Sequence, residues 1–283
     1  MSLIADHVFY SYGMGSVFES QAVRDVSVKI EDGEALGIIG QTGSGKSTLI
    51  QMLNGLIRPV SGSVYFDGAD IFDQEYDRRL LRTKVGLVFQ YPEYQLFETT
   101  VLKDVCFGPK NQGFSENEAG LRAYDALKKV GMDEKLYDAS PFELSGGEKR
   151  RAAIAGVLAM HPRVMILDEP TAGLDPVGRH ALLDMIMDVR ENTGMSIVLV
   201  SHNMDDIAAY VDRIVVMNEG AAVLDGTVSE VFSHADALKR YGLDVPQATA
   251  ILHRLNAMGI PVNTDAYTPA DAVSSIVAAV KVR

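Results

Sequence analysis

GQTGSGKST, residues 40–48, follows the short apolar run Ala35–Ile39 and precedes Leu49–Gly55, which has the character of a helix. A strand, a glycine-rich loop and a helix in this order form the setting of a P-loop. In such a loop the backbone N–H groups wrap a phosphate chain, Lys46 brings charge to the β- and γ-phosphates, and Ser47 offers a hydroxyl to Mg²⁺. The sequence therefore predicts a nucleotide-phosphate site formed by Gly40, Gln41, Thr42, Gly43, Ser44, Gly45, Lys46, Ser47 and Thr48.

A second nucleotide element lies in Val164–Glu169, where an apolar strand ends in two adjacent carboxylates. Ligands of open α/β sheets bind at the carboxyl ends of the strands, so both carboxylates are placed at the expected rim. Asp168 can hold the Mg²⁺ shell through water, in the manner of other P-loop enzymes, and Glu169 is then free to act as general base on an attacking water. A strand that ends in Asp-Glu can also be purely structural, and it is the P-loop that favours the catalytic interpretation.

Two single polar residues end further strands of the same expected sheet. Gln90 closes Val85–Phe89, and His202 closes Ile197–Ser201. Each alone could be an ordinary polar residue at a strand end, but parallel strands bring these ends to the rim that carries the P-loop. We therefore expect Gln90 to contact Mg²⁺ and water, and His202 to contact the γ-phosphate as a catalytic residue.

The rhythm of strands and helices predicts an α/β P-loop NTPase domain with an antiparallel β subdomain, a helical subdomain and a small C-terminal helical extension. The main domain covers residues 1–235, with the helical subdomain at about 91–160. Residues 236–283 form the extension, with helices at Gln247–Met258 and from Pro269 onward. Two amphipathic helices make a thin core, so the extension either packs on the main domain or serves dimerisation or docking.

The stretch LSGGEKRR, residues 144–151, opens a helix after two glycines, and a helix N-terminus of this kind binds anions. Together with the P-loop and the Asp168-Glu169 strand, it makes the chain resemble an ABC-type ATPase, whose signature motif LSGGE matches. The resemblance implies that two such domains pair head to tail. The signature loop of one then binds the γ-phosphate held by the P-loop of the other, through Ser145, Gly146, Gly147 and Glu148.

The same resemblance implies roles for two more residues. Asp175 lies in Gly173-Leu-Asp-Pro176, which is similar to the D-loop that crosses the dimer interface. Tyr12 matches the aromatic residue that stacks on adenine, although it would be unremarkable as a plain strand aromatic. The chain departs from the family at Glu148, where glutamine is usual, and the added negative charge leaves the activity of this composite site open.

Within that family the chain looks like the ATP-binding component of energy-coupling factor (ECF) importers, the second of the two paired kinds. The finer match is carried by Val88–Phe97, Val101–Pro109, Ala152–Met160, Asp168–Pro176 and Gly242–Gln247. It implies ATP and Mg²⁺ as cofactors, and three kinds of partner: a second ATPase subunit, a transmembrane coupling protein (T component) and substrate-capture membrane proteins (S components). The transported vitamin or metal ion is chosen by the capture proteins, so this chain does not identify it.

Four bulky apolar or aromatic side chains follow Gln90 on a single loop. A loop of this composition is typical of a groove that binds a helix of a partner protein. Local packing of the same side chains is the alternative. The predicted docking residues are Tyr91, Tyr94, Leu96 and Phe97.

Composition narrows the functional classes. A formal net charge of −12 argues against sequence-independent binding of nucleic acid, because such binding needs a positively charged surface. No signal peptide and no apolar stretch of membrane-spanning length are evident, and the single Cys106 suits a reducing cytosol. We therefore expect a peripheral protein on the cytoplasmic face of the cell membrane, held there by its partners.

Three rival classes share some of these motifs. ABC-type ATPases of DNA repair or chromosome structure carry long coiled coils between P-loop and signature, and residues 48–144 contain no sustained heptads. A translation-factor relative would carry two cassettes in one chain, and a P-loop kinase would lack LSGG. The motifs do not decide whether the native ATPase pair is a homodimer or a heterodimer.

Overall fold

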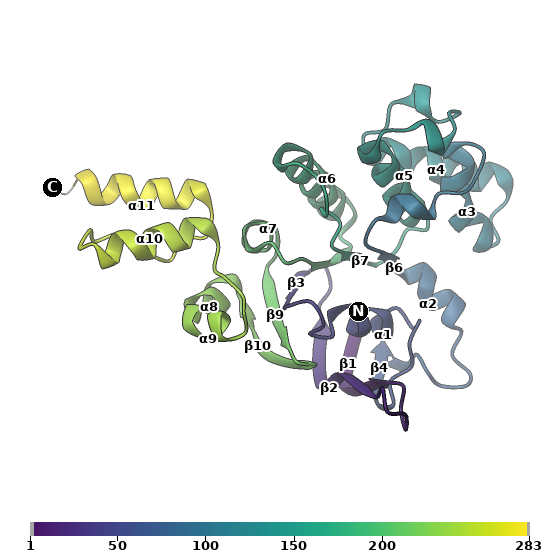
Figure 1. Ribbon diagram of the computed structural model, residues 1–283. Coiled ribbons are helices and arrows are strands. Elements are labelled where there is room, and N and C mark those ends of the chain that lie inside the picture. Colours follow the sequence, from purple (N-terminus) through teal and green to yellow (C-terminus); the bar gives the residue numbers. More distant parts are fainter. Residues whose placement is uncertain (1–2, 282–283) are drawn as a thin grey trace.

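A computed structural model describes residues 3–281, and two β-sheets organise it (Figure 1). The larger sheet has six strands. In spatial order they are β10 (Ala221–Thr227), β9 (Arg213–Asn218), β3 (Ala35–Ile39), β8 (Ser196–Val200), β7 (Val164–Asp168) and β6 (Val85–Val88). All neighbours in it run parallel except β9 and β10, which form an antiparallel hairpin. Every residue of β3, β7 and β8 is buried, so the predicted buried parallel strands are confirmed.

The smaller sheet is antiparallel and covers one face of the larger one. Its strands, in spatial order, are β2 (Ser20–Ile30), β1 (Leu3–Tyr12), β4 (Ser61–Phe66) and β5 (Ala69–Asp70). One core cluster joins this sheet, α1 (Lys46–Leu53) and the near face of the parallel sheet. Along β7, Val164 and Ile166 belong to this cluster, whereas Met165 and Leu167 face the other core. The alternation along one strand therefore places a layer on each side of the sheet.

The predicted helical subdomain is present at the upper right of Figure 1. It consists of α3 (Val101–Asn111), α4 (Glu116–Lys129) and α5 (Gly146–Leu158), with Thr100, Ser115 and Ser145 as their N-caps. A 3₁₀ turn, Glu134–Leu136, follows α4. The far face of the parallel sheet also carries α6 (Pro176–Thr193) and α7 (Met204–Tyr210), whose buried residues share a core with this subdomain.

A short helix, α2 (Arg78–Lys84), was not expected from the sequence. Only Leu81 of it is buried, so it has no apolar period to reveal it, and its N-cap Asp77 accepts hydrogen bonds from Arg79 N and Leu80 N. This helix is therefore stabilised by its N-cap and by its contacts with the rest of the fold, and not by an amphipathic pattern in its sequence.

The C-terminal part contains α8 (Val228–Ser233), α9 (Ala235–Arg240), α10 (Gln247–Ala257) and α11 (Pro269–Lys281). Leu238 and Leu243 are buried in the main core, which therefore continues past the expected boundary at residue 235. A separate small cluster formed by α10, α11 and the loop between them begins at Ala248. Figure 1 shows these two helices side by side, projecting away from the sheets. Val273, Val277 and Val280 on α11 stay exposed, which leaves an apolar stripe on the projecting pair.

Within residues 3–281, no helix combines the length and the apolar character that crossing a bilayer requires.

Candidate functional site

The loop between β3 and α1 has a backbone that only glycine can supply at two positions. Gly40 has a φ of +157°, and a Cβ there would lie 2.3 Å from the carbonyl oxygen of Met217. Gly45 has a φ of +102°, and a Cβ there would lie 2.2 Å from the carbonyl oxygen of Ala22. The loop is thus held tightly between neighbouring strands, which fixes its free N–H groups for a phosphate chain.

Lys46 opens α1 and is 7% exposed. Its ammonium donates hydrogen bonds to the carbonyl oxygens of Gly40 at 2.7 Å and Gln41 at 2.9 Å, so the side chain folds back over the loop. Burial lowers the pKa of Lys46, and the nearby carboxylates of Glu169 and Asp168 oppose that shift. A buried cation beside a glycine loop is suited to an anionic ligand.

Asp168 is the last residue of β7 and is 9% exposed. Burial raises its pKa, while the hydroxyl of Ser47 acts in the opposite direction by hydrogen bonding. A carboxylate and a hydroxyl at this position are ligands that magnesium accepts, and this ion usually keeps phosphate and water ligands as well. In the described part of the chain, no group of three or more His, Cys, Asp or Glu side chains could hold a metal ion.

Glu169 lies at the junction of three strand ends. Its Oε2 accepts a hydrogen bond from Gln90 Nε2 at 3.0 Å, and its Oε1 lies 3.4 Å from His202 Nδ1. Its backbone has a φ of +47°, and its N–H donates to the carbonyl oxygen of Val200 at 2.9 Å. Gln90 and His202, which the sequence placed at the same rim, therefore each contact Glu169, one at each carboxylate oxygen.

A cavity of about 450 Å³ connects these elements. Tyr12 lies on its wall, 45% exposed, with its hydroxyl 3.2 Å from Thr48 Oγ1 and its ring edge-on to Tyr10 at 4.9 Å. An exposed aromatic ring at the mouth of a phosphate pocket can stack on a base. The remaining lining residues are Ser20, Gln21, Ala22, Thr42, Gly43, Gly45, Lys46, Ser47, Gln90, Asp168 and Glu169.

The signature residues lie elsewhere, on the N-terminus of α5, and none of them lines that cavity. Ser145 and Glu148 form a capping box: the Ser145 hydroxyl lies 2.6 Å from Glu148 Oε2, and Ser145 N donates to the same oxygen at 2.8 Å. These hydrogen bonds lower the pKa of Glu148. Gly146 has open space around it, and a Cβ on Gly147 would meet only the end of Arg151, so no other part of the chain crowds the side-chain positions of these two glycines.

Asp175 is exposed and caps α6, with Oδ1 accepting a hydrogen bond from Gly178 N at 2.7 Å. The loop from Glu169 to the start of α6 therefore ends on a defined helix N-terminus.

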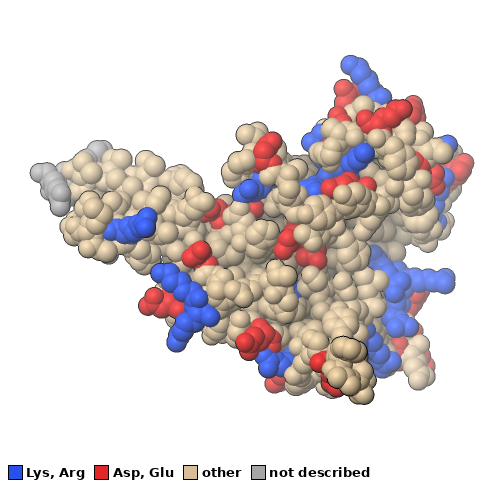
Figure 2. Space-filling model, viewed as in Figure 1, with Lys and Arg blue, Asp and Glu red and all other residues tan. Residues whose placement is uncertain are grey.

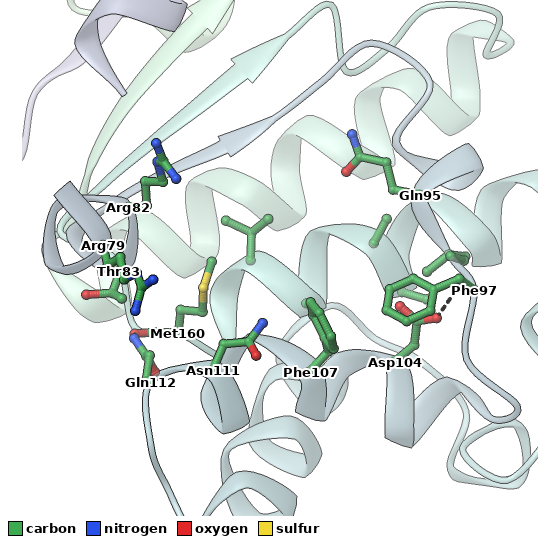
Figure 3. Close-up of a pocket in the computed structure, with 16 residues that line it drawn as sticks. Arg79, Arg82, Thr83, Gln95, Phe97, Asp104, Phe107, Asn111, Gln112 and Met160 are labelled. Atoms are coloured by element: carbon green, nitrogen blue, oxygen red, sulfur yellow. Dashed lines mark hydrogen bonds between the residues drawn. The ribbon is translucent and has the colours of Figure 1, made fainter. Parts of the chain in front are cut away.

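A separate groove of about 680 Å³ lies between α2, α3 and α5 (Figure 3). Phe97 and Phe107 meet edge-on at 5.0 Å on its wall, and Asp104 accepts hydrogen bonds from the backbone N–H groups of Phe97 and Glu98. On the opposite side, Arg79 and Arg82 extend from α2, where Figure 2 shows a concentration of basic side chains. The groove therefore has an apolar floor and aromatic wall on one side and positive charge on the other.

The predicted docking residues take different places around this groove. Phe97, which is 57% exposed, lines the groove. Tyr94, which is 85% exposed, and Tyr91, which is also exposed, lie outside the groove lining. Leu96, by contrast, is 8% exposed and belongs to the main core, so it forms part of the groove floor. The contribution of α2 was missed in the sequence, because an exposed helix without an apolar period gives no signal.

Sequence reasoning also missed Arg150, whose side chain is 5% exposed. Its guanidinium donates to both carboxylate oxygens of Glu93, at 3.3 and 2.9 Å. It also donates to the carbonyl oxygens of Pro170 and Ala172 at 2.9 and 2.8 Å. One buried cation therefore joins the loop beside the groove, the signature helix and the segment that follows Glu169.

Known proteins with the same features were identified by comparison. The family model described as "ABC transporter" matches residues 23–172. The chain is 50% identical over 276 residues to the "Energy-coupling factor transporter ATP-binding protein EcfA2" of Caldanaerobacter subterraneus subsp. tengcongensis, covering 98% of this chain and 96% of that protein. It is 48% identical to the protein of the same name from Clostridium perfringens, covering 98% and 97%.

Solved structures agree with this. CbiO1 from Clostridium perfringens, described as part of the ABC transporter complex CbiONQ, superposes with a TM-score of 0.74 at 39% identity, over 84% of this chain and 93% of that one. The ATP-binding cassette MJ0796, a dimer bound to ADP and Pi in a post-hydrolysis state, gives a TM-score of 0.71 at 29% identity, over 80% and 98%. The predicted α/β P-loop fold and ATPase activity are thereby confirmed. This chain belongs to the ABC transporter family of ATPases, as an ATP-binding component of the energy-coupling factor type.

Proposed function

We propose that this chain hydrolyses Mg-ATP at a head-to-tail interface with a second ABC ATPase subunit, and that the cycle powers import of a vitamin or metal ion through membrane partners. One observation carries the first half of the proposal. The chain has two phosphate-binding elements, the loop 40–48 and the signature 145–147, and the second does not line the cavity of the first. A signature loop turned away from its own P-loop can complete only a neighbour's site.

The residues at the strand ends have defined tasks in hydrolysis. Glu169 is the general base that takes the proton of the attacking water, and the amide of Gln90 holds its carboxylate in place at 3.0 Å. His202 lies 3.4 Å from the same carboxylate and contacts the γ-phosphate. Ser47 and Asp168 would hold Mg²⁺, which would supply positive charge to the phosphate chain. Tyr12 stacks on the adenine ring, and Asp175 belongs to the loop that crosses to the partner.

The groove between α2, α3 and α5 is the docking site for a helix of the transmembrane coupling protein (T component). Its volume of about 680 Å³, with Phe97 and Phe107 on one side, suits the apolar face of an amphipathic helix. Arg79 and Arg82 favour an acidic residue on the incoming helix. Through this contact, together with substrate-capture proteins (S components), the chain is held peripherally at the cytoplasmic face of the membrane.

The ion pair of Arg150 with Glu93 gives this docking site a mechanical connection to the ATP site. Glu93 lies in the 3₁₀ turn Pro92–Gln95 beside the groove, and Arg150 also holds the carbonyl oxygens just after Glu169. A closing motion of the signature helix would thus move the docking loop with it.

Purification from native membranes tests both halves of this proposal. A tagged chain should sediment with membranes, be released by detergent or chaotrope, and bring down a second ATPase subunit and at least one integral membrane protein. ATP hydrolysis by the purified complex should fall when Ser145 is changed to Arg, although that residue lies outside the chain's own cavity. Recovery of the chain alone in the soluble fraction, or full hydrolysis by the Ser145→Arg complex, would contradict the proposal.

A further inference from the structure

The segment that leads into the C-terminal extension is attached at two places beside the nucleotide cavity. Residues 241–246 join α9 to α10, and together with Gln247, the first residue of α10, they form a hinge segment. At one end of this hinge segment, Gln41 Nε2 donates a hydrogen bond to the carbonyl oxygen of Gly242 at 3.3 Å. At the other end, the backbone N–H of Gln247 donates to Asp205 Oδ1 at 2.8 Å. The first partner belongs to the P-loop and the second to α7, so the hinge segment bridges the two sides of the site.

The contact with Gln41 is unusually close. Gly242 has a φ of +67°, and a Cβ there would lie 1.6 Å from Gln41 Nε2, so only glycine allows this approach. The carbonyl oxygen of the same Gln41 accepts a hydrogen bond from Lys46 Nζ at 2.9 Å. Phosphate oxygens in the loop compete for this ammonium, so a bound nucleotide removes a restraint on the residue that holds the hinge segment.

Asp205, the second contact of the hinge segment, lies in the first turn of α7. Asn203 caps α7, and its Oδ1 accepts a hydrogen bond from Asp205 N at 2.9 Å. His202, the residue before this cap, lies 3.4 Å from Glu169. A shift of His202 toward a phosphate therefore moves the first turn of α7, and with it the carboxylate that holds Gln247.

From this geometry we propose that Gln41 and Asp205 are positioning residues that couple ATP binding in the P-loop to the placement of the C-terminal helices α10 and α11. The inference goes beyond the transport function proposed above and rests only on nucleotide binding by the P-loop. ATP binding weakens the hold on the hinge segment, and by thermodynamic reciprocity a weakened hold favours ATP binding.

Hydrogen exchange of the full-length chain, read by mass spectrometry over residues 241–257, tests this coupling. The parent protein carries Glu169→Gln so that ATP stays intact, and calorimetry measures nucleotide affinity in parallel. We expect ATP to speed exchange in the parent. In Asp205→Ala the Gln247 amide should exchange fast already without ATP, the ATP-induced change should be lost, and ATP affinity should rise about fivefold, the lower end of typical coupling.

Three further variants separate coupling from general loosening. Asp205→Asn keeps an oxygen acceptor for Gln247 N and should behave like the parent. Gly242→Ala places a methyl group against the Gln41 side chain and breaks its hydrogen bond to the hinge segment. It should give the same exchange and affinity results as Asp205→Ala. Tyr267→Phe removes the hydrogen bond of that hydroxyl to Ser229 Oγ at 3.1 Å, which anchors the extension to α8, and should leave the ATP response intact.

Two results would overturn the proposal. One is unchanged exchange over residues 241–257 when calorimetry shows ATP bound. The other is a Tyr267→Phe protein that responds like Asp205→Ala, since any loosening of the extension would then suffice. Melting of each variant establishes that it is folded, and none of these readouts depends on a membrane partner.

Discussion

Gln90 Nε2 donates a hydrogen bond of 3.0 Å to Glu169 Oε2, which joins two residues 79 positions apart at the edge of the parallel sheet. Glu169 is 23% exposed at its side chain and has His202 on its other oxygen. The amide therefore orients the expected general base, and the loop that leaves Gln90 runs directly to the docking groove. The proposed contact with a membrane partner and the position of the proposed base would thus be linked through one short segment.

Glu169→Gln should retain ATP binding and lose turnover. An amide has the shape of the carboxylate but cannot accept the proton of water, and loss of a general base typically costs about 10²–10⁴-fold in rate. Single-turnover hydrolysis by the assembled complex, with ATP affinity measured alongside, checks this. Turnover within threefold of the unmodified complex would remove Glu169 from its assigned role.

Lys46→Ala should weaken nucleotide binding itself, because the ammonium that faces the β- and γ-phosphates is lost. Lys29→Ala is the matched control. Lys29 is exposed, and among the described residues its ammonium forms an ion pair only with Glu31, at 2.6 Å. Calorimetry with ATP should separate the two. Equal affinities would contradict the assignment of the loop.

Glu148→Gln should raise ATP-dependent activity of the composite site by roughly two- to fivefold, the range expected for an exposed charge interaction. Glutamine can keep the capping box with Ser145, so α5 stays intact while the negative charge near the partner's phosphates is removed. Glu143→Gln removes a nearby exposed charge outside the capping box and serves as the control. The comparison requires the assembled ATPase pair, and equal activity of the Glu148→Gln and original complexes would show that the charge is harmless.

Tyr94→Ala and Phe97→Ala should impair association with the membrane partner and leave ATP binding intact, with each ring worth roughly 1–3 kcal/mol as an interface anchor. Both side chains are more than half exposed, so the melting temperature of the free chain should change little for Tyr94 and modestly for Phe97, which meets Phe107 edge-on. Co-purification from membranes measures the association.

Leu96→Ala provides the contrast on the same loop. Because Leu96 is buried in the main core, its truncation should lower the stability of the free chain by about 2–5 kcal/mol. A drop of that size for Tyr94→Ala would instead assign the loop to packing and end the docking proposal.

The sequence alone identified the P-loop, the Asp168-Glu169 strand and the signature helix, because each is a local pattern in which the residue types and their spacing carry the chemistry. The meeting of Gln90, Glu169 and His202 could also be anticipated, since parallel strands bring their carboxyl ends to one edge. The buried strands were also evident from the sequence as short apolar runs.

Other features depend on contacts between segments far apart in the chain, which no local pattern encodes. Arg150 reads as one more charge in a basic run, and only the packing of α5 buries it against Glu93 and the carbonyl groups after Glu169.

The sequence by itself thus determined the fold family, and it predicted the nucleotide and the chemistry at the strand ends, since these follow from backbone geometry and residue type. The tertiary structure decided that Leu96 is a core residue and that α2 helps to build the groove. It also decided that the P-loop residue Gln41 holds Gly242, 201 positions away. Burial and long-range hydrogen bonds exist only once the layers have packed, which is why these features could not be predicted from the order of the amino acids.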